Sequence, residues 1–305
     1  MCAKKVTEKP NDVGTTGHSW DGIQELNNPL PRWWVWTFYV TILFSLGYVI
    51  AFPAWPMITR ATQGVIGTNQ RLNVAADIET WNDTNAPIRE KLVAADVNAI
   101  PNDPALRDFA VNAGRAVFNT NCIQCHMREG QGNRQGGYPT LSDNDWLYGG
   151  GMEAIILTIT HGVRNTTDPD ARNVGFFMPA WSEKSEPGAM KDAATAQLTD
   201  EQVSQVVNYV LDMSGQTADA TKAAAGAAIF AENCVACHGE DGKGNRDMGS
   251  PNLTDAIWVY GGDEAGLTQT LVVGRGGVMP AWGGRLSEAD IISVATYVHA
   301  LGGGE

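Results

Sequence analysis

Two short segments of the chain share the pattern Cys-x-x-Cys-His, in which a histidine directly follows the second of two thiols. The thiols are Cys122 and Cys125 in the first segment and Cys234 and Cys237 in the second, and the histidines are His126 and His238. Two thiols at this spacing can add to the vinyl groups of one porphyrin, which places the adjacent histidine under the iron. The pattern therefore predicts two covalently bound haem c groups.

Other uses of paired cysteines fit this spacing poorly. The two knuckles of a zinc ribbon lie about 15–20 residues apart, whereas a far longer stretch separates Cys125 from Cys234. A thioredoxin-like pair needs a βαβ pattern around it, and neither segment has one. A structural disulfide requires no neighbouring histidine. Four of the five cysteines are used by the two segments, and Cys2 is left as an inert thiol in the amino-terminal tail.

A second repeated motif, Met-Pro-Ala-Trp, is the expected source of the sixth iron ligands, Met178 and Met279. A thioether opposite histidine favours ferrous iron and raises the reduction potential, as an electron carrier requires. Proline after each methionine restricts the segment that holds the sulfur. Methionine is often only core filler, but these two occupy matching places. The weaker alternatives are His161, Met127, Met152 and Met248.

These motifs belong to an internal repeat, in which Gly114 to Phe118 corresponds to Gly226 to Phe230. We expect each copy to begin with an Ala-rich helix and to end with a helix whose apolar residues follow a period of 3.6. Residues 104–215 and 216–305 are predicted to be two tandem domains. The first copy carries two insertions, around 165–174 and 182–195, which we expect to be surface loops.

The resulting fold is all-α, with one amino-terminal transmembrane helix followed by two class I cytochrome c domains. Glycines in the opening helices should allow close contact with the closing helices, Gly114 against Tyr209 and Gly226 against Tyr297. Asp103 or Asn102 is a plausible cap for the first opening helix, with Pro104 in its first turn. Each haem supplies much of the core that so small a domain otherwise lacks.

The amino-terminal third predicts a membrane anchor. Residues 33–52 are uncharged and apolar over the length that a bilayer core of about 30 Å requires of a helix, with tryptophans at both ends. We expect a cytoplasmic tail at 1–31, an anchor at 32–56 and a periplasmic linker at 57–103. The basic residues before the anchor, Lys4, Lys5, Lys9 and Arg32, indicate a cytoplasmic amino terminus.

Three hydroxyl residues, Thr37, Thr41 and Ser45, recur at every fourth position of the anchor and therefore share one face. Small polar residues on one stripe are typical of helix–helix contacts in lipid. The alternative is that each hydroxyl bonds the carbonyl about one turn earlier in its own helix. The sequence does not favour one of these over the other.

The balance of charge excludes some partners. The formal net charge is −13, and charged residues make up 18% of the chain. Binding to nucleic acid requires clusters of lysine and arginine against the phosphates, so we expect no nucleic-acid partner. The hydrophobic content of 43% is sufficient for packed cores, and the length suits about two domains besides the anchor.

Taken together, the sequence resembles the dihaem subunit, subunit III, of cbb3-type cytochrome c oxidases. The resemblance includes residues 21–26, the run from Asn28 to Trp34, one anchor and two c-type domains. It implies the axial pairs His126 with Met178 and His238 with Met279. It also implies partners: a soluble periplasmic cytochrome c as donor, a monohaem cytochrome c subunit, and the haem–copper catalytic subunit that reduces oxygen to water and pumps protons. Some members of this family have a second membrane helix, whereas this sequence shows one.

The expected activity is one-electron transfer within an oxidoreductase that spans the bacterial inner membrane. If both irons have six ligands, this chain has no oxygen-reducing site of its own. A dihaem peroxidase is a second possibility, but it needs an open iron, and the duplicated methionine motif argues against one. A membrane-anchored cytochrome that serves a periplasmic dehydrogenase, or a free-standing shuttle, is a third.

Overall fold

The computed structural model describes residues 13–185, 188–192, 195 and 197–305. Cys2 and the lysines Lys4, Lys5 and Lys9 lie outside the described residues. The chain forms two compact units, residues 1–84 and 85–305. Each is described separately.

The amino-terminal unit begins with a β-hairpin at the place expected to be a polar tail. Strands β1 (Thr15–Trp20) and β2 (Ile23–Leu26) pair antiparallel. Asp21 and Gly22 form the turn, and both have positive φ, 49° and 84°. An Asp-Gly turn of this kind matches the twist of the two strands it joins, so the hairpin has a clear local cause.

Helix α1 (Arg32–Ala51) confirms the expected anchor helix. It is long and apolar enough to cross a membrane, with a mean hydropathy of 1.6, and Pro53 follows its end. The hydroxyls of Thr37, Thr41 and Ser45 bond carbonyls three or four residues earlier, at 2.7 to 2.9 Å. All three side chains are therefore satisfied within their own helix.

The predicted linker contains a helix, α2 (Gln70–Ala94), which continues through Pro87. Its carboxyl end belongs to the second unit, where Leu92 is fully buried together with Ile100 and Ala110. The Arg89 guanidinium lies 2.9 Å from the Asp290 carboxylate. The end of the linker is therefore part of a packed core.

The second unit is helical apart from isolated bridges among the described residues. Its helices are α3 (Pro104–Asn121), α4 (Ile123–His126), α5 (Met152–His161), α6 (Asp200–Met213), α7 (Ala220–Asn233), α8 (Val235–His238), α9 (Glu264–Val273) and α10 (Glu288–His299), with short 3-10 turns at η1 (Ile100–Asn102) and η2 (Arg128–Gly130). The Asp103 carboxylate accepts bonds from the first-turn amides of α3, as predicted.

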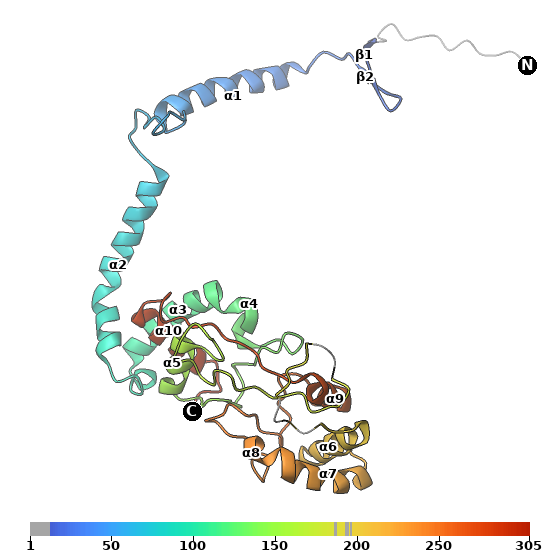
Figure 1. Ribbon diagram of the computed structural model, residues 1–305. Coiled ribbons are helices and arrows are strands. Elements are labelled where there is room, and N and C mark those ends of the chain that lie inside the picture. Colours follow the sequence, from blue (N-terminus) through green and yellow to red (C-terminus); the bar gives the residue numbers. More distant parts are fainter. Residues whose placement is uncertain (1–12, 186–187, 193–194, 196) are drawn as a thin grey trace, which may run out of the picture. The chain divides into compact units, whose positions relative to one another are not determined.

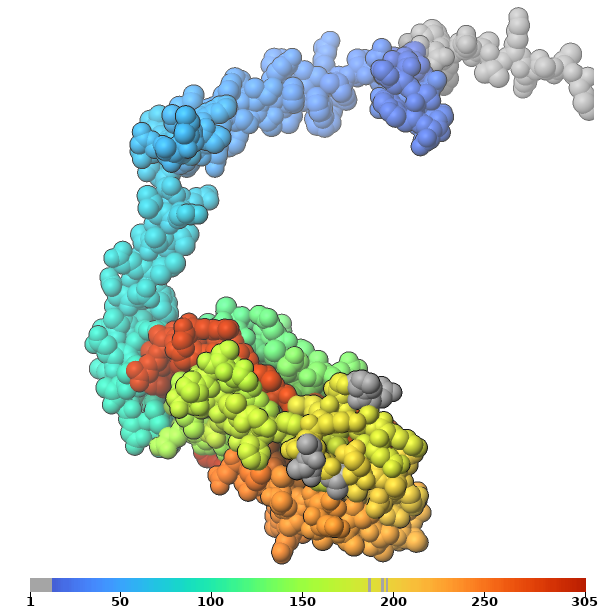
Figure 2. All heavy atoms as spheres, in the orientation of Figure 1, coloured from blue at the N-terminus to red at the C-terminus, as the bar shows by residue number. Residues whose placement is uncertain are grey.

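The helices pack in exchanged order across the repeat, as Figure 1 shows. The opening helix of the first copy, α3, packs against the closing helix of the second copy, α10. The opening helix of the second copy, α7, packs against the closing helix of the first, α6. In Figure 2 the red carboxyl-terminal residues accordingly lie against green ones, and orange residues against yellow ones.

Two glycines show how close these crossings are. A Cβ atom on Gly114 would lie 2.1 Å from the Ser293 carbonyl oxygen, and one on Gly226 would lie 2.1 Å from that of Gln205. The expectation that glycines permit the crossings is confirmed, but the pairing was wrong: Gly114 meets Tyr297 and Gly226 meets Tyr209. The two tyrosines are equivalent in the repeat, so the sequence pattern fits either pairing.

Two hydrophobic cores result. We call the assembly of α3, α4, α5 and α10 half A, and the assembly of α6, α7, α8 and α9 half B. Half A centres on Phe118 and Val294, and half B on Val206 and Phe230. The predicted boundary at 215/216 divides the sequence copies, but it does not divide the packing.

Candidate haem sites

One helical turn presents each Cys-x-x-Cys-His motif. In half A the Cys122 carbonyl accepts bonds from the amides of Cys125 at 3.1 Å and His126 at 2.9 Å. The turn in half B has the same bonds, 3.2 Å to Cys237 and 3.0 Å to His238. Residues three and four apart share a helix face, so both thiols and the imidazole lie on one side of the turn, as a porphyrin edge requires.

Each histidine is oriented by a backbone carbonyl. The Nδ1 atom of His126 lies 3.2 Å from the Pro139 carbonyl oxygen, and that of His238 lies 3.2 Å from the Pro251 oxygen. A ring that donates from Nδ1 leaves the Nε2 lone pair available for a metal. Burial lowers the pKa of both imidazoles below the ordinary value, which further favours the neutral ligating form.

The thiols are unlike those of redox enzymes. Burial, and secondarily the neighbouring Cys125, raises the pKa of Cys122 to about 11. Burial and Cys237 raise the pKa of Cys234 to about 12. Disulfide oxidoreductases instead lower the pKa of the attacking cysteine. The protein environment therefore does not activate these thiols for exchange chemistry.

The methionine segments are placed by short backbone ladders. Val163, just after α5, exchanges two hydrogen bonds with Met279, both of 3.0 Å. Arg275, just after α9, exchanges two with Met178, both of 2.8 Å. Each methionine is thus held at the end of the middle helix of the other sequence copy.

Side-chain packing agrees with these ladders. Met279 packs against the core of half A, as does Cys122, and Met178 packs against the core of half B, which contains Cys234. The structure therefore groups the predicted site residues into two sets: Cys122, Cys125, His126 and Met279 in one, and Cys234, Cys237, His238 and Met178 in the other. The packing disagrees with the pairing of His126 with Met178 expected from the resemblance.

Two glycines make the ladders possible. Gly162 and Gly274 end the two middle helices, both with φ of 75°. A Cβ on Gly162 would lie 2.3 Å from the Met279 carbonyl oxygen, and one on Gly274 would lie 2.7 Å from that of Met178. Both positions thus need glycine for conformation and for space.

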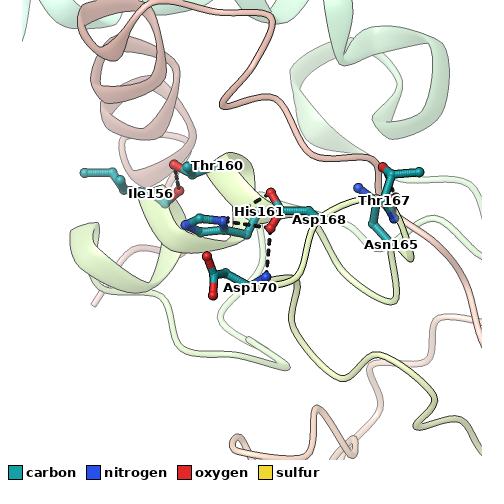
Figure 3. A network of polar contacts seen from close by, with 7 residues as sticks. All are labelled: Ile156, Thr160, His161, Asn165, Thr167, Asp168 and Asp170. Atoms are coloured by element: carbon teal, nitrogen blue, oxygen red, sulfur yellow. Dashed lines mark hydrogen bonds and ion pairs between the residues drawn. The ribbon is translucent and has the colours of Figure 1, made fainter.

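The rival ligand His161 belongs to a partly buried network of polar contacts, shown in Figure 3. Its Nδ1 atom lies 3.2 Å from both carboxylate oxygens of Asp168. The same carboxylate accepts a 2.8 Å bond from the Asp170 amide. This network accounts for the position of the ring. Met152, another alternative, is 2% exposed within the core of half A at the start of α5.

A buried donor in half B supports the presence of a polar cofactor edge. Trp181 follows Met178 in the repeated motif, and its indole Nε1 is buried without a hydrogen-bond partner among the described residues. A buried donor normally has a partner, and a haem propionate would supply an acceptor. With the donor set of two thiols, imidazole and thioether in each half, the residues present fit haem c.

Sequence reasoning missed the residues that orient the proposed ligands, namely Pro139, Pro251, Val163 and Arg275. The two prolines were visible as matching positions of the repeat. The others act through backbone atoms or through contacts across the copies, so their residue types carry no signal.

Sequence models of three protein families match the chain. They are described as the N-terminal domain of cytochrome oxidase-cbb3, FixP (residues 12–59), cytochrome c (111–214) and cytochrome C oxidase, cbb3-type, subunit III (221–298). The two cytochrome matches follow the sequence copies, whereas the helices pack across them.

Full-length relatives agree. A cbb3-type cytochrome c oxidase subunit CcoP of Cereibacter sphaeroides is 56% identical over all of both chains. The CcoP subunit of Rhodobacter capsulatus is 51% identical, again over all of both. The FixP subunit of Azorhizobium caulinodans is 47% identical over 95% of this chain and 94% of its own. The chain therefore belongs to the CcoP/FixP family, subunit III of the cbb3-type cytochrome c oxidases.

Proposed function

We propose that this chain is the membrane-anchored electron-transfer subunit of a cbb3-type oxidase and carries two covalently bound haem c groups. The haems supply one-electron oxidation and reduction of iron. The chain fixes their position through four thiols and holds imidazole and thioether ligands toward each iron. Electrons come from a soluble periplasmic cytochrome c, and pass to a monohaem subunit and the haem–copper catalytic subunit.

The axial pairs in this proposal are His126 with Met279 and His238 with Met178. The observation that carries it is the pair of backbone ladders that fix Met279 beside Val163 and Met178 beside Arg275. Thioether ligation stabilises ferrous iron. With an imidazole and a thioether held toward each iron, the chain would have no oxygen-reducing site of its own, and oxygen reduction would take place in another subunit.

The proposed topology is a single pass through the inner membrane with a cytoplasmic amino terminus. The described residues contain one helix that can span a membrane, α1, and the identity of the family fits an inner-membrane location. Arg32 at its beginning, and the three lysines earlier in the sequence, favour the cytoplasmic side for that end. The two cytochrome domains then lie in the periplasm, where the anchor keeps them close to the rest of the oxidase.

The axial pairs can be tested in the intact complex with Met279→Ala and Met178→Ala. Each variant should open one iron, which then binds carbon monoxide and is preferentially bleached by peroxide. Trypsin releases the two haem peptides separately, because Arg115 and Arg128 flank the first motif and Lys222 and Lys243 flank the second. Mass spectrometry then identifies the bleached haem.

We expect Met279→Ala to open the iron of the haem attached to Cys122 and Cys125. Met178→Ala should open the iron of the other haem. The reverse assignment would disprove the crossed pairs, and no carbon monoxide binding in either variant would disprove methionine ligation. Purification in mild detergent tests the assembly: the subunit should co-purify with a haem b and copper protein. Recovery of the chain alone would favour a free-standing anchored cytochrome.

A further inference from the structure

A single arginine links the two methionine segments. Arg164 directly follows Val163, which holds Met279. Its Nε atom donates a 2.6 Å hydrogen bond to the Phe176 carbonyl oxygen, and its Nη1 atom donates a 2.9 Å bond to the Gly277 oxygen. Phe176 and Gly277 each lie two residues before a methionine of the repeated motif. One guanidinium therefore forms hydrogen bonds with the backbone two residues before each of the two proposed sixth ligands.

The backbone at Arg164 holds the side chain in this place. Its φ is 51°, a region that non-glycine residues rarely adopt. The Arg164 amide donates a 2.7 Å bond to the Arg172 carbonyl, and the Arg172 amide donates one of 3.1 Å to Gly162. Such a conformation persists where surrounding contacts over-determine it. The insertion that contains Arg172, expected to be a simple surface loop, thus supports the residue that bridges both segments.

The bridge has no equivalent in the repeat. Gly162 and Gly274 correspond by their place after the middle helices, so the position equivalent to Arg164 is Gly276. Arg172 and Arg275 do not correspond in the repeat, but they stack on the corresponding tyrosines Tyr148 and Tyr260, at 5.1 and 4.5 Å from the ring centroids. Arg164 has no such counterpart, because glycine occupies its place in the second copy.

We propose that Arg164 is a positioning residue that couples the two distal methionine segments, so that both iron–thioether bonds depend on one side chain. This inference rests on the proposed axial ligation by Met178 and Met279. Guanidinium is permanently charged and presents its donors in a rigid fork, and bonds from a charged donor are stronger than neutral ones. If the guanidinium loses its hydrogen bond to one carbonyl, the side chain can rotate, and its hydrogen bond to the other segment weakens as well.

Arg164→Gln in the intact complex tests the coupling, because the glutamine side chain is uncharged and cannot donate to both carbonyls at once. We expect the ferric methionine-to-iron charge-transfer band in the far red to weaken at both haems, and both reduction potentials to fall. Exogenous imidazole should displace each thioether about tenfold faster, the effect of losing one charge-assisted hydrogen bond. Arg164→Lys keeps one charged donor and should give a smaller change at both haems.

Arg107→Gln is the matched control. This exposed arginine pairs with the neighbouring Asp108 at 3.1 Å, so both haems should behave as in the unmodified protein. A change confined to one haem in Arg164→Gln, or none at either, would overturn the coupling. Arg164→Lys checks folding, because it preserves side-chain length and charge.

Met178→Ala and Met279→Ala, measured alongside, separate this inference from the proposed ligation. If each variant keeps the full far-red band, the axial ligands are wrong. If each variant loses the contribution of one haem, while Arg164→Gln keeps the band at both haems, the ligation stands and the role of Arg164 is wrong.

Discussion

The two halves of the haem unit have the same parts but a different relation to the chain. Half B uses a continuous segment, from Met178 through α6, α7 and α8 to the end of α9. Half A joins α3, α4 and α5 to Met279 and α10 from the carboxyl end. The comparison teaches that a duplicated sequence specifies the kind of contact at each position but leaves open which copy provides the partner.

The halves also differ directly after the proximal histidine. Met127 has φ 60° and ψ 178°, whereas the equivalent Gly239 has φ 78° and ψ 159°. This region of backbone conformation is accessible almost only to glycine. Half A therefore carries strain at a position where half B has none, although the turns are otherwise the same.

The largest expected effect comes from deleting residues 277–305. This removes Met279 and α10 from half A, while half B keeps every helix and ligand. We expect the first haem to lose its sixth ligand and its surrounding core, and the second to keep its absorption spectrum. Absorption spectra and haem-peptide masses measure this. Tandem domains would give the opposite result, an intact first haem and a damaged second one.

A double-mutant cycle measures the exchanged packing at a single contact. The rings of Phe118 and Tyr297 lie 5.3 Å apart, so Phe118→Leu and Tyr297→Leu should couple by about 0.5–1.5 kcal/mol in the free energy of unfolding. Phe118→Leu with Tyr209→Leu serves as the matched control and should be additive. Coupling in the control pair, with none in the test pair, would restore the tandem arrangement.

Met127→Gly should relieve the local strain in half A and increase the free energy of unfolding by about 1 kcal/mol, after allowance for the greater chain entropy of glycine. Gly239→Met should lower it in half B. Chemical denaturation followed at each haem gives the comparison. Equal changes in the free energy of unfolding at the two positions would show that the difference in backbone conformation does not affect stability.

The smallest effect concerns Asp145, where the second copy has Ile257. Burial, with added repulsion from Asp255 and Asp143, raises the pKa of Asp145 to about 6. The folded protein then binds more protons at this group than the unfolded chain does, so stability falls as pH rises from about 4 to about 6. Asp145→Asn should flatten this slope and add less than about 1 kcal/mol at neutral pH, since the group is partly solvated. An unchanged slope in thermal melts from pH 4 to 7 would contradict it.

Much of the fold follows from the sequence, because local patterns have local causes. The helical turn of each attachment motif, the anchor helix and the cap at Asp103 depend on neighbours in the chain, and all are present. The hairpin at Asp21 and Gly22 was missed although its signal is equally local. Helix α2 was missed because Pro87 indicated a break, yet the helix continues through Pro87 and buries Leu92 near its carboxyl end.

The pairing of the copies could not be predicted in this way. Tyr209 and Tyr297 are chemically identical, and either could cover Gly114. Which closing helix packs on which opening helix depends on how the connections after α5 and α9 cross. The contacts at this crossing are backbone hydrogen bonds between Val163 and Met279 and between Arg275 and Met178. Backbone hydrogen bonds of this kind can form with every residue type except proline as donor, so they leave almost no mark on the sequence.

The discontinuity of half A determines the order in which the nascent protein can mature. Ribosomes synthesise the Cys122–His126 segment early, yet the core around this segment is incomplete until α10 has been made. Half B can close sooner, although its attachment segment is translated later. We therefore expect half B to fold before half A, and pulse-labelled chains digested with protease should become resistant first around Cys234–His238.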